Sequence, residues 1–140
     1  MDEKEQKIRD RFAAERLDPA TVDRNVLDAV PFKFAGRGLN ISTICEEFTH
    51  ICPMTGLPDI GTLTIEYEPD QAIVELKSLK YYLLQYRQVG TFYEHVVFQV
   101  LDDLVASIKP KWMHLDYEVS ARGGIRSSIS VQWPDSGSGS

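Results

Sequence analysis

The sequence has no long apolar run and only two cysteines, and each absence excludes a class of protein. No segment approaches the roughly 20 consecutive apolar residues that span a bilayer, so we expect no membrane partner. The first five residues are mostly charged and lack the apolar stretch of a secretory signal. Two cysteines without an export signal predict a cytoplasmic protein whose thiols stay reduced.

The sequence also lacks the basic excess of a nucleic-acid-binding protein. Its 15 lysine and arginine residues stand against 21 aspartate and glutamate residues, a formal net charge of −6. Proteins that bind the phosphate backbone usually have the opposite sign, so we expect no nucleic-acid partner. An anionic small ligand would need a local basic cluster, which residues 75–80 with Arg122 and Arg126 can supply.

Two sequence motifs are missing as well. There is no Gly-x-Gly-x-x-Gly, so a dinucleotide, if bound, is not held by a Rossmann fold. Six residues separate Cys45 from Cys52, which matches none of the common zinc spacings. His50 can still reach the surroundings of Cys52 in three dimensions, but the sequence favours no metal ion.

The chain of 140 residues, 43% apolar and 26% charged, fits one globular domain. Residues 1–37 are predicted to form a peripheral helix over 2–16 and an irregular lead-in. Residues 38–133 carry the clear periodic patterns. Residues 134–140 end in Ser-Gly-Ser-Gly-Ser, which predicts a flexible tail.

Apolar and polar residues alternate in several segments, the period of a half-buried strand. These segments are 39–43, 62–68, 113–119 and 127–133. A short strand is expected over 72–76. Residues 52–61 are rich in proline and glycine and predict a loop.

The period becomes helical at Leu79 to Tyr86 and again at Val97 to Ile108. Thr91 and Glu94 have the spacing of a capping box for the second helix. Arg122-Gly123-Gly124 is predicted to be the turn between the last two strands.

This order of strands and helices predicts an α+β fold, with an antiparallel sheet and helices on one of its faces. The other face would be uncovered. A wide exposed apolar sheet face usually marks assembly into an oligomer, so we expect further copies of the chain as partners.

Cys52 is the first candidate for chemistry. A thiol in a loop between proline and glycine can be exposed, as a nucleophile requires. The alternative is a small buried hydrophobic residue, which is the usual state of a free cysteine. Cys45, which ends an alternating strand, fits that alternative better.

Asp59, between Pro58 and Ile60-Gly61, is either a turn residue or an acid that a folded-back loop brings beside Cys52. A thiolate paired with a carboxylic acid suits addition to an unsaturated carbon, because the acid protonates the developing anion. Glu94 is either the capping-box carboxylate or an acceptor of paired N–H donors from a purine-like ligand.

Four segments together resemble the NADPH-dependent 7-cyano-7-deazaguanine reductases, the nitrile reductases of queuosine biosynthesis, a tRNA modification pathway. They occur in the family's order over roughly residues 40–133. They are Glu47-Phe48-Thr49 with Cys52-Pro53-Met54-Thr55-Gly56-Leu57-Pro58-Asp59; Glu75-Leu76-Lys77-Ser78-Leu79-Lys80-Tyr81-Tyr82; Gly90-Thr91-Phe92-Tyr93-Glu94 with Leu101-Asp102-Asp103-Leu104; and Arg122-Gly123-Gly124-Ile125.

The resemblance implies a tunnelling fold for residues 38–133, with the sheets of several subunits joined into a barrel, typically a decamer of two pentamers. It implies reduction of the nitrile of a small deazapurine to an aminomethyl group, with two NADPH consumed in turn.

The resemblance also implies roles for individual residues. Cys52 would be the nucleophile that forms a covalent thioimide, and Asp59 the acid that protonates nitrogen. Glu94 would bind the deazapurine. Further substrate contacts are implied for Val74, Glu75, Leu76 and Tyr93, and cofactor contacts for Lys77, Ser78, Lys80, Arg122 and Gly123.

One position departs from the family pattern. Many members have histidine immediately before the substrate glutamate, where this chain has Tyr93, and His95 follows instead. Tyrosine can still donate a hydrogen bond, but a histidine's role in proton transfer there is in doubt.

Three alternatives remain open. One is the related amidinotransferase that modifies the same nitrile within tRNA, which would not need the Glu75–Tyr82 segment. Another is a zinc-dependent tunnelling-fold enzyme that acts on GTP or a pterin. The third is a binding module in which Cys52 is unreactive.

Overall fold

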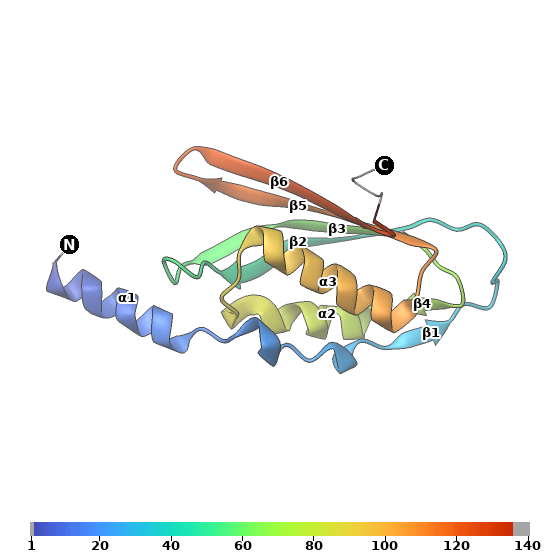
Figure 1. The fold of residues 1–140 in the computed structure, drawn as a ribbon, viewed down its shortest axis with the longest axis horizontal. Coiled ribbons are helices and arrows are strands. Elements are labelled where there is room, and N and C mark those ends of the chain that lie inside the picture. Colours follow the sequence, from blue (N-terminus) through green and yellow to red (C-terminus); the bar gives the residue numbers. More distant parts are fainter. Residues whose placement is uncertain (1, 136–140) are drawn as a thin grey trace.

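The structure is a computed structural model that describes residues 2–135. Its main sheet has four antiparallel strands in the order β2-β3-β5-β6, which are β2 (Ile41–Ile51), β3 (Pro58–Glu68), β5 (Trp112–Arg122) and β6 (Ile125–Trp133). Two helices, α2 (Leu76–Leu84) and α3 (Tyr93–Ile108), cover one face of the sheet (Figure 1). The predicted α+β fold is confirmed.

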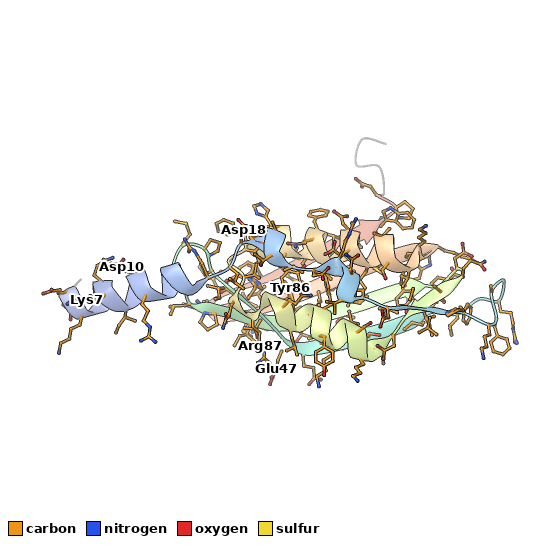
Figure 2. The ribbon with its side chains drawn as sticks, turned by 90° about the horizontal axis from the view of Figure 1, so that it is seen from below. Lys7, Asp10, Asp18, Glu47, Tyr86 and Arg87 are labelled. Atoms are coloured by element: carbon orange, nitrogen blue, oxygen red, sulfur yellow. The ribbon has the colours of Figure 1, made fainter. Side chains whose placement is uncertain are left out.

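The N-terminal helix α1 (Glu3–Glu15) projects away from the sheet and its two helices (Figure 1). Asp2 caps it, because its carboxylate accepts a hydrogen bond from the Glu5 N–H at 2.7 Å. Figure 2 shows Lys7 and Asp10 along this projecting helix. The predicted peripheral helix is therefore present.

The segment after α1 is more regular than the sequence predicts. It contains two short 3₁₀ turns, η1 (Pro19–Thr21) and η2 (Arg24–Val26), and the strand β1 (Ala29–Pro31). β1 pairs antiparallel with β4 (Ala72–Val74). These pieces have only three residues each, too few to leave a periodic pattern in the sequence.

Several predicted boundaries differ from the structure. β2 continues past a bulge between Cys45 and Phe48 and ends only at Ile51. The predicted loop over 52–61 is too long, since β3 already begins at Pro58.

The predicted strand over 72–76 ends at Val74, because Glu75 caps α2 and Leu76 is its first residue. A further 3₁₀ turn, η3 (Gln85–Gln88), extends α2. None of the helices within residues 2–135 has the length and apolar character of a membrane span.

The hydrophobic core lies between the sheet and the helices. Alternate residues of β3 and β5 point toward the helices and are fully buried, among them Leu63, Ile65, Leu115 and Tyr117. They pack with the apolar sides of α2 and α3. Within this core the Tyr82 hydroxyl donates to Asp103 at 2.5 Å. Burial raises the pKa of that phenol well above its usual range, so the hydroxyl keeps its proton.

The opposite face of the sheet is uncovered, as predicted, but it is polar. Its residues on β3 and β5 include Thr62, Thr64, Glu66, Asp116 and Glu118. The expectation of a wide apolar face is therefore wrong, since most residues that alternate with the core positions are hydroxyl-bearing or charged. Ile44 and Ile60 are exposed apolar exceptions on this face.

Candidate active site

The turn between β2 and β3 positions Cys52. The Cys52 N–H donates to the Leu57 carbonyl at 2.9 Å, and the Gly56 N–H donates to the Cys52 carbonyl at 2.9 Å. Gly56 has φ +73°, a left-handed conformation that glycine adopts without a steric penalty. The thiol is free and half-buried, so it is held at the edge of the core.

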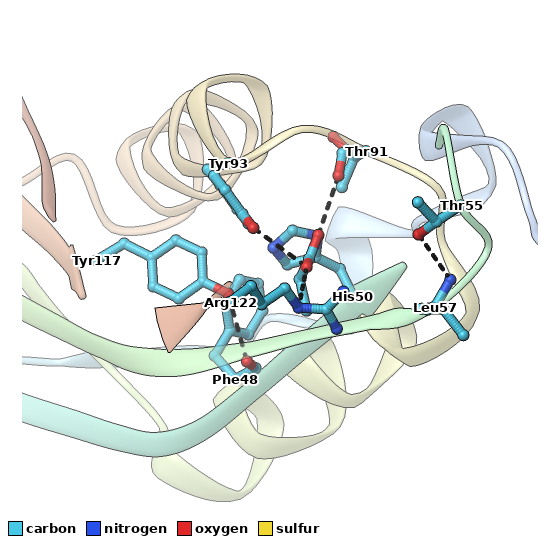
Figure 3. Close-up of polar contacts among 9 residues, drawn as sticks. Phe48, His50, Thr55, Leu57, Thr91, Tyr93, Tyr117 and Arg122 are labelled. Carbon is cyan, nitrogen blue, oxygen red and sulfur yellow. Dashed lines mark hydrogen bonds and ion pairs between the residues drawn. The ribbon is translucent and has the colours of Figure 1, made fainter. Parts of the chain in front are cut away.

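Asp59 lies in β3 and is 3% exposed, so it is not a turn residue. Its Oδ1 accepts a hydrogen bond from the Tyr93 hydroxyl at 3.1 Å and lies 3.2 Å from Arg122 Nε (Figure 3). These contacts join β3 to the first turn of α3 and to the end of β5. Both contacts involve the same carboxyl oxygen, Oδ1.

Tyr93 and Glu94 are the first two residues of α3. The predicted capping box is wrong: the N-cap is Phe92, and no side chain caps the helix. Glu94 is exposed, with its carboxylate in the first helical turn. The helix is held there by the preceding segment, because the Thr91 N–H donates to the Ile51 carbonyl at 3.0 Å.

The Tyr93 phenol interacts electrostatically with Asp59 and Cys52. Burial is the main cause that raises its pKa, and the Asp59 carboxyl is the next. Arg122 opposes the rise, whereas the Cys52 thiol adds to it. Tyr93 therefore remains a neutral hydrogen-bond donor.

His50 also belongs to this site, although the sequence indicated it only as a possible metal ligand. It pairs with Asp59 across β2 and β3, and it is 0% exposed. Its Nδ1 lies 3.0 Å from the Thr91 carbonyl oxygen, which can only accept, so Nδ1 carries the hydrogen of the neutral ring. Nε2 is then a buried acceptor without a hydrogen-bond partner among the described residues.

Three aromatic rings surround the His50 imidazole. Its centroid lies 5.8 Å from Phe48, 5.8 Å from Tyr93 and 5.7 Å from Tyr117. Burial is the largest cause that lowers the His50 pKa, and the nearby Asp59 carboxylate opposes it. The sequence does contain a signal for this position. Residues two apart in a strand lie on the same face, so His50 shares the buried face of the core residue Phe48.

The remaining predicted site residues lie at the other end of the molecule. The start of α2, next to β4, is at the right in Figure 1, whereas the β2–β3 turn, the start of α3 and the β5–β6 turn are at the left. The predicted site residues of one chain therefore form two groups. The group at the left end is Cys52, Asp59, Tyr93, Glu94, Arg122 and Gly123, and the group at the right end is Val74, Glu75, Leu76, Lys77, Ser78 and Lys80.

Several groups at this second end already have partners. The Glu75 carboxylate accepts from the Lys77 and Ser78 N–H groups at 3.0 and 2.6 Å. These two bonds, that to Ser78 first, lower its pKa. The Ser78 hydroxyl accepts from the Asp28 N–H and donates to the Glu75 carbonyl. Val74 is buried, while Lys77 and Lys80 are exposed.

A largely apolar hollow of about 350 Å³ lies between α2 and β2. It extends from Leu76 and Lys80 to Arg87, and Cys45 and Glu47 line its β2 side. Figure 2 shows Glu47 and Arg87 on the same side of the molecule. Cys45 is half-buried, and burial is the main cause that raises the pKa of its thiol.

Comparison with known proteins identifies one family. Residues 58–137 match the family model described as QueF-like protein. A relative from Caldicellulosiruptor bescii, named NADPH-dependent 7-cyano-7-deazaguanine reductase, is 43% identical over 127 residues, which cover 89% of this chain and 97% of the relative. A relative of the same name from Chlorobium chlorochromatii is 46% identical over 108 residues, covering 77% and 93%.

A solved structure has a similar fold. The crystal structure of the archaeosine synthase QueF-Like in the apo form has a TM-score of 0.60 over 68% of this chain and 91% of that chain. The two sequences are 18% identical, so this likeness concerns the fold alone.

Proposed function

The chain belongs to the QueF-like family of NADPH-dependent 7-cyano-7-deazaguanine reductases, and we propose that it reduces this nitrile through a thioimide on Cys52. The overall reaction consumes two NADPH and two protons and converts the nitrile carbon into an aminomethyl group. The observation that carries the proposal is the buried Asp59 carboxyl of β3, which contacts from α3 and β5 hold near the turn that carries Cys52.

In the first step the Cys52 thiol releases its proton to solvent, and the sulfur adds to the nitrile carbon. One C–N π bond breaks, and its electron pair takes up a proton on nitrogen. Asp59 is the proposed donor, because its Oδ1 is held by Tyr93 and Arg122 and its Oδ2 can carry the proton. The thioimide carbon is more electrophilic than a nitrile carbon, so it accepts the first hydride. The S–C bond then breaks and returns the Cys52 sulfur, which leaves an imine that accepts the second hydride.

Glu94 is the proposed anchor of the deazapurine. Its carboxylate is exposed in the first turn of α3, next to Tyr93, and can accept two N–H bonds from the base. Tyr93 directs its hydroxyl to Asp59, so its proposed part in substrate binding is to set the position of the acid.

The two separated ends support an assembly in which copies share each site. Val74, Glu75 and Leu76, proposed to complete the base site, lie away from Glu94 in the same chain. A second copy can supply them if its α2 start faces the Cys52 turn of the first. The proposed assembly is a homo-oligomer, with the decamer of two pentamers expected for the family.

Bound NADPH supplies the hydride for each of the two reductions. The exposed Lys77 and Lys80 at the start of α2 fit an anionic nucleotide, and Lys80 borders the apolar hollow together with Arg87. Arg122 and Gly123 are the proposed contacts from the other end. Ser78 fits a cofactor contact less well, since both hydrogen bonds of its hydroxyl are internal.

Mass spectrometry of the protein with the nitrile base, without NADPH, tests the covalent step. We expect an adduct on the wild type and on Cys45→Ala but none on Cys52→Ala. An unmodified wild type would refute the thioimide and favour a binding module. NADPH oxidation with the free nitrile base separates the reductase from the amidinotransferase, and stoichiometric zinc with a GTP- or pterin-converting activity would identify the zinc enzyme.

Mixing inactive variants tests the shared site. Cys52→Ala and Lys77→Ala each damage a different end of the chain. If a site combines the Cys52 turn of one copy with the α2 start of another, co-refolded mixtures should regain activity. Some sites then receive Cys52 from the Lys77→Ala variant and Lys77 from the Cys52→Ala variant. If each chain forms its own site, the mixtures stay as inactive as the separate variants.

A further inference from the structure

The uncovered face of the sheet holds a cluster that the proposed reaction does not use. Glu66 of β3 and His114 and Asp116 of β5 place one ligand atom each within 4.8 Å of the other two. All three side chains are partly buried, and those of His114 and Asp116 are 33% and 37% exposed. The cluster lies on the face opposite the helices.

The sheet fixes the relative positions of the three residues. Glu66 is paired directly with His114 across β3 and β5, and Asp116 follows His114 by two residues on the same face. The Ser130 hydroxyl of β6 donates a hydrogen bond to Asp116 Oδ1 and so orients that carboxylate. The cluster is therefore built on three adjacent strands and does not depend on a loop.

The charges in the cluster are unbalanced without a cation. Two carboxylates face one imidazole, and His114 Nε2 lies 3.6 Å from Asp116 Oδ1. Among ion pairs between described residues, Asp116 pairs with His114 alone and Glu66 has no partner. The nearby Lys111 is paired with Glu68 at 3.7 Å. Glu66 thus stays uncompensated in a partly buried setting.

We propose that Glu66, His114 and Asp116 bind a divalent transition-metal ion with the ligand preference of Zn²⁺. Imidazole and carboxylate ligands suit zinc, whereas Mg²⁺ and Ca²⁺ favour oxygen ligands alone. Ligand atoms about 2.1 Å from a tetrahedral ion lie about 3.4 Å apart, so the widest separation in the cluster must contract by up to about 1.4 Å. Rotation of the Glu66 side chain can provide this movement, and water completes the coordination.

The ion has a structural place in the fold. It links β3 to β5 on the polar face, while Asp59 and His50 belong to the buried side of the same sheet. It therefore stabilises the sheet and takes no part in the proposed hydride chemistry.

Titration of the chelator-treated full chain with Zn²⁺, and with Co²⁺ as a spectroscopic probe, tests the site. We expect one ion per chain and a Tm higher by roughly 5–10 °C when Zn²⁺ is present at about 100 times its Kd. His114→Gln and Asp116→Asn should weaken binding at least about tenfold. Glu118→Gln, on the same strand and face, is the matched control and should bind as the wild type does.

The two thiols are the competing zinc ligands, so the titration is repeated in Cys45→Ser/Cys52→Ser. Retention of the site in this double variant supports the proposal. Loss of binding there, equal affinity in the His114→Gln and Glu118→Gln variants, or no binding by the folded wild type would each overturn it.

Discussion

The Tyr93 hydroxyl donates a hydrogen bond to Asp59 Oδ1 across 3.1 Å, between residues 34 positions apart in the sequence. This bond connects the first turn of α3, which carries Glu94, to the strand that carries the acid. Through it, the residue proposed to bind the base and the residue proposed to donate the proton keep a fixed relative position.

Removing this hydroxyl is expected to slow the reaction without unfolding the chain. Tyr93→Phe keeps the ring but leaves Arg122 alone to hold Asp59 Oδ1, so kcat should fall about tenfold, equivalent to one lost hydrogen bond of about 1.4 kcal/mol. KM for the nitrile should change little. Steady-state kinetics beside Tyr81→Phe, an exposed tyrosine of α2, provide the check; equal rates for Tyr93→Phe and wild type would contradict the positioning role.

Arg122 is expected to matter for both activity and stability. Its ion pair with Asp59 joins a guanidinium that is 43% exposed to a carboxylate that is 4% exposed, so Arg122→Gln leaves a buried carboxylate without its cation and should lower the free energy of unfolding by about 1–3 kcal/mol. The KM for NADPH should rise about tenfold or more relative to the wild type, and this difference should be smaller at high salt, because salt screens the attraction between Arg122 and the cofactor. Arg126→Gln, an exposed arginine just beyond the same turn, is the control; an equal effect of both substitutions would indicate only a general charge effect.

Because the His50 imidazole is buried, we expect the chain to lose stability in mild acid. Burial lowers its pKa below the ordinary value of 6.5, so below about pH 6.5 the unfolded chain binds a proton that the folded chain does not. The free energy of unfolding therefore falls as pH decreases, at His50 by at most about 2 kcal/mol between pH 7 and pH 5. Above about pH 7.5 this contribution is constant.

Denaturant unfolding of wild type and His50→Phe at several pH values measures this difference. The variant lacks the titrating ring, so the free energy of unfolding of the wild type minus that of the variant should fall as the pH falls. His95→Phe, an exposed histidine, should retain the pH dependence of the wild type. A difference in the free energy of unfolding between wild type and His50→Phe that stays constant from pH 7 to pH 5 would contradict the buried, neutral state of His50.

Gly61 is expected to tolerate no side chain. A Cβ there would lie 2.3 Å from the Glu118 carbonyl oxygen and 2.6 Å from a carbon of the Tyr117 ring. Gly61→Ala should destabilise the chain by about 2–3 kcal/mol or more, because the strand β5 must shift. Gly38→Ala meets no atom within 4 Å and should change stability by less than about 0.5 kcal/mol. Thermal unfolding of both variants tests the contrast.

The last turn of the sheet could be predicted from local sequence. Gly123 and Gly124 have φ +57° and +80°, and they connect Arg122 to its paired residue Ile125. Two consecutive left-handed residues favour glycine, so Arg-Gly-Gly between alternating segments predicts this hairpin. The helical period of α3 and the alternation of β3 and β5 likewise follow from the spacing of apolar residues.

The sequence by itself determined the periodic elements, the fold class and, through the joint occurrence of four segments, the family. Only the tertiary structure decided that Asp59 is a buried strand residue, that His50 pairs with it, and that Val74 to Lys80 lie at the opposite end from Cys52. Local spacing fixes which face of an element a residue occupies. Strand register and helix packing, which join residues far apart in the chain, decide which of those faces meet.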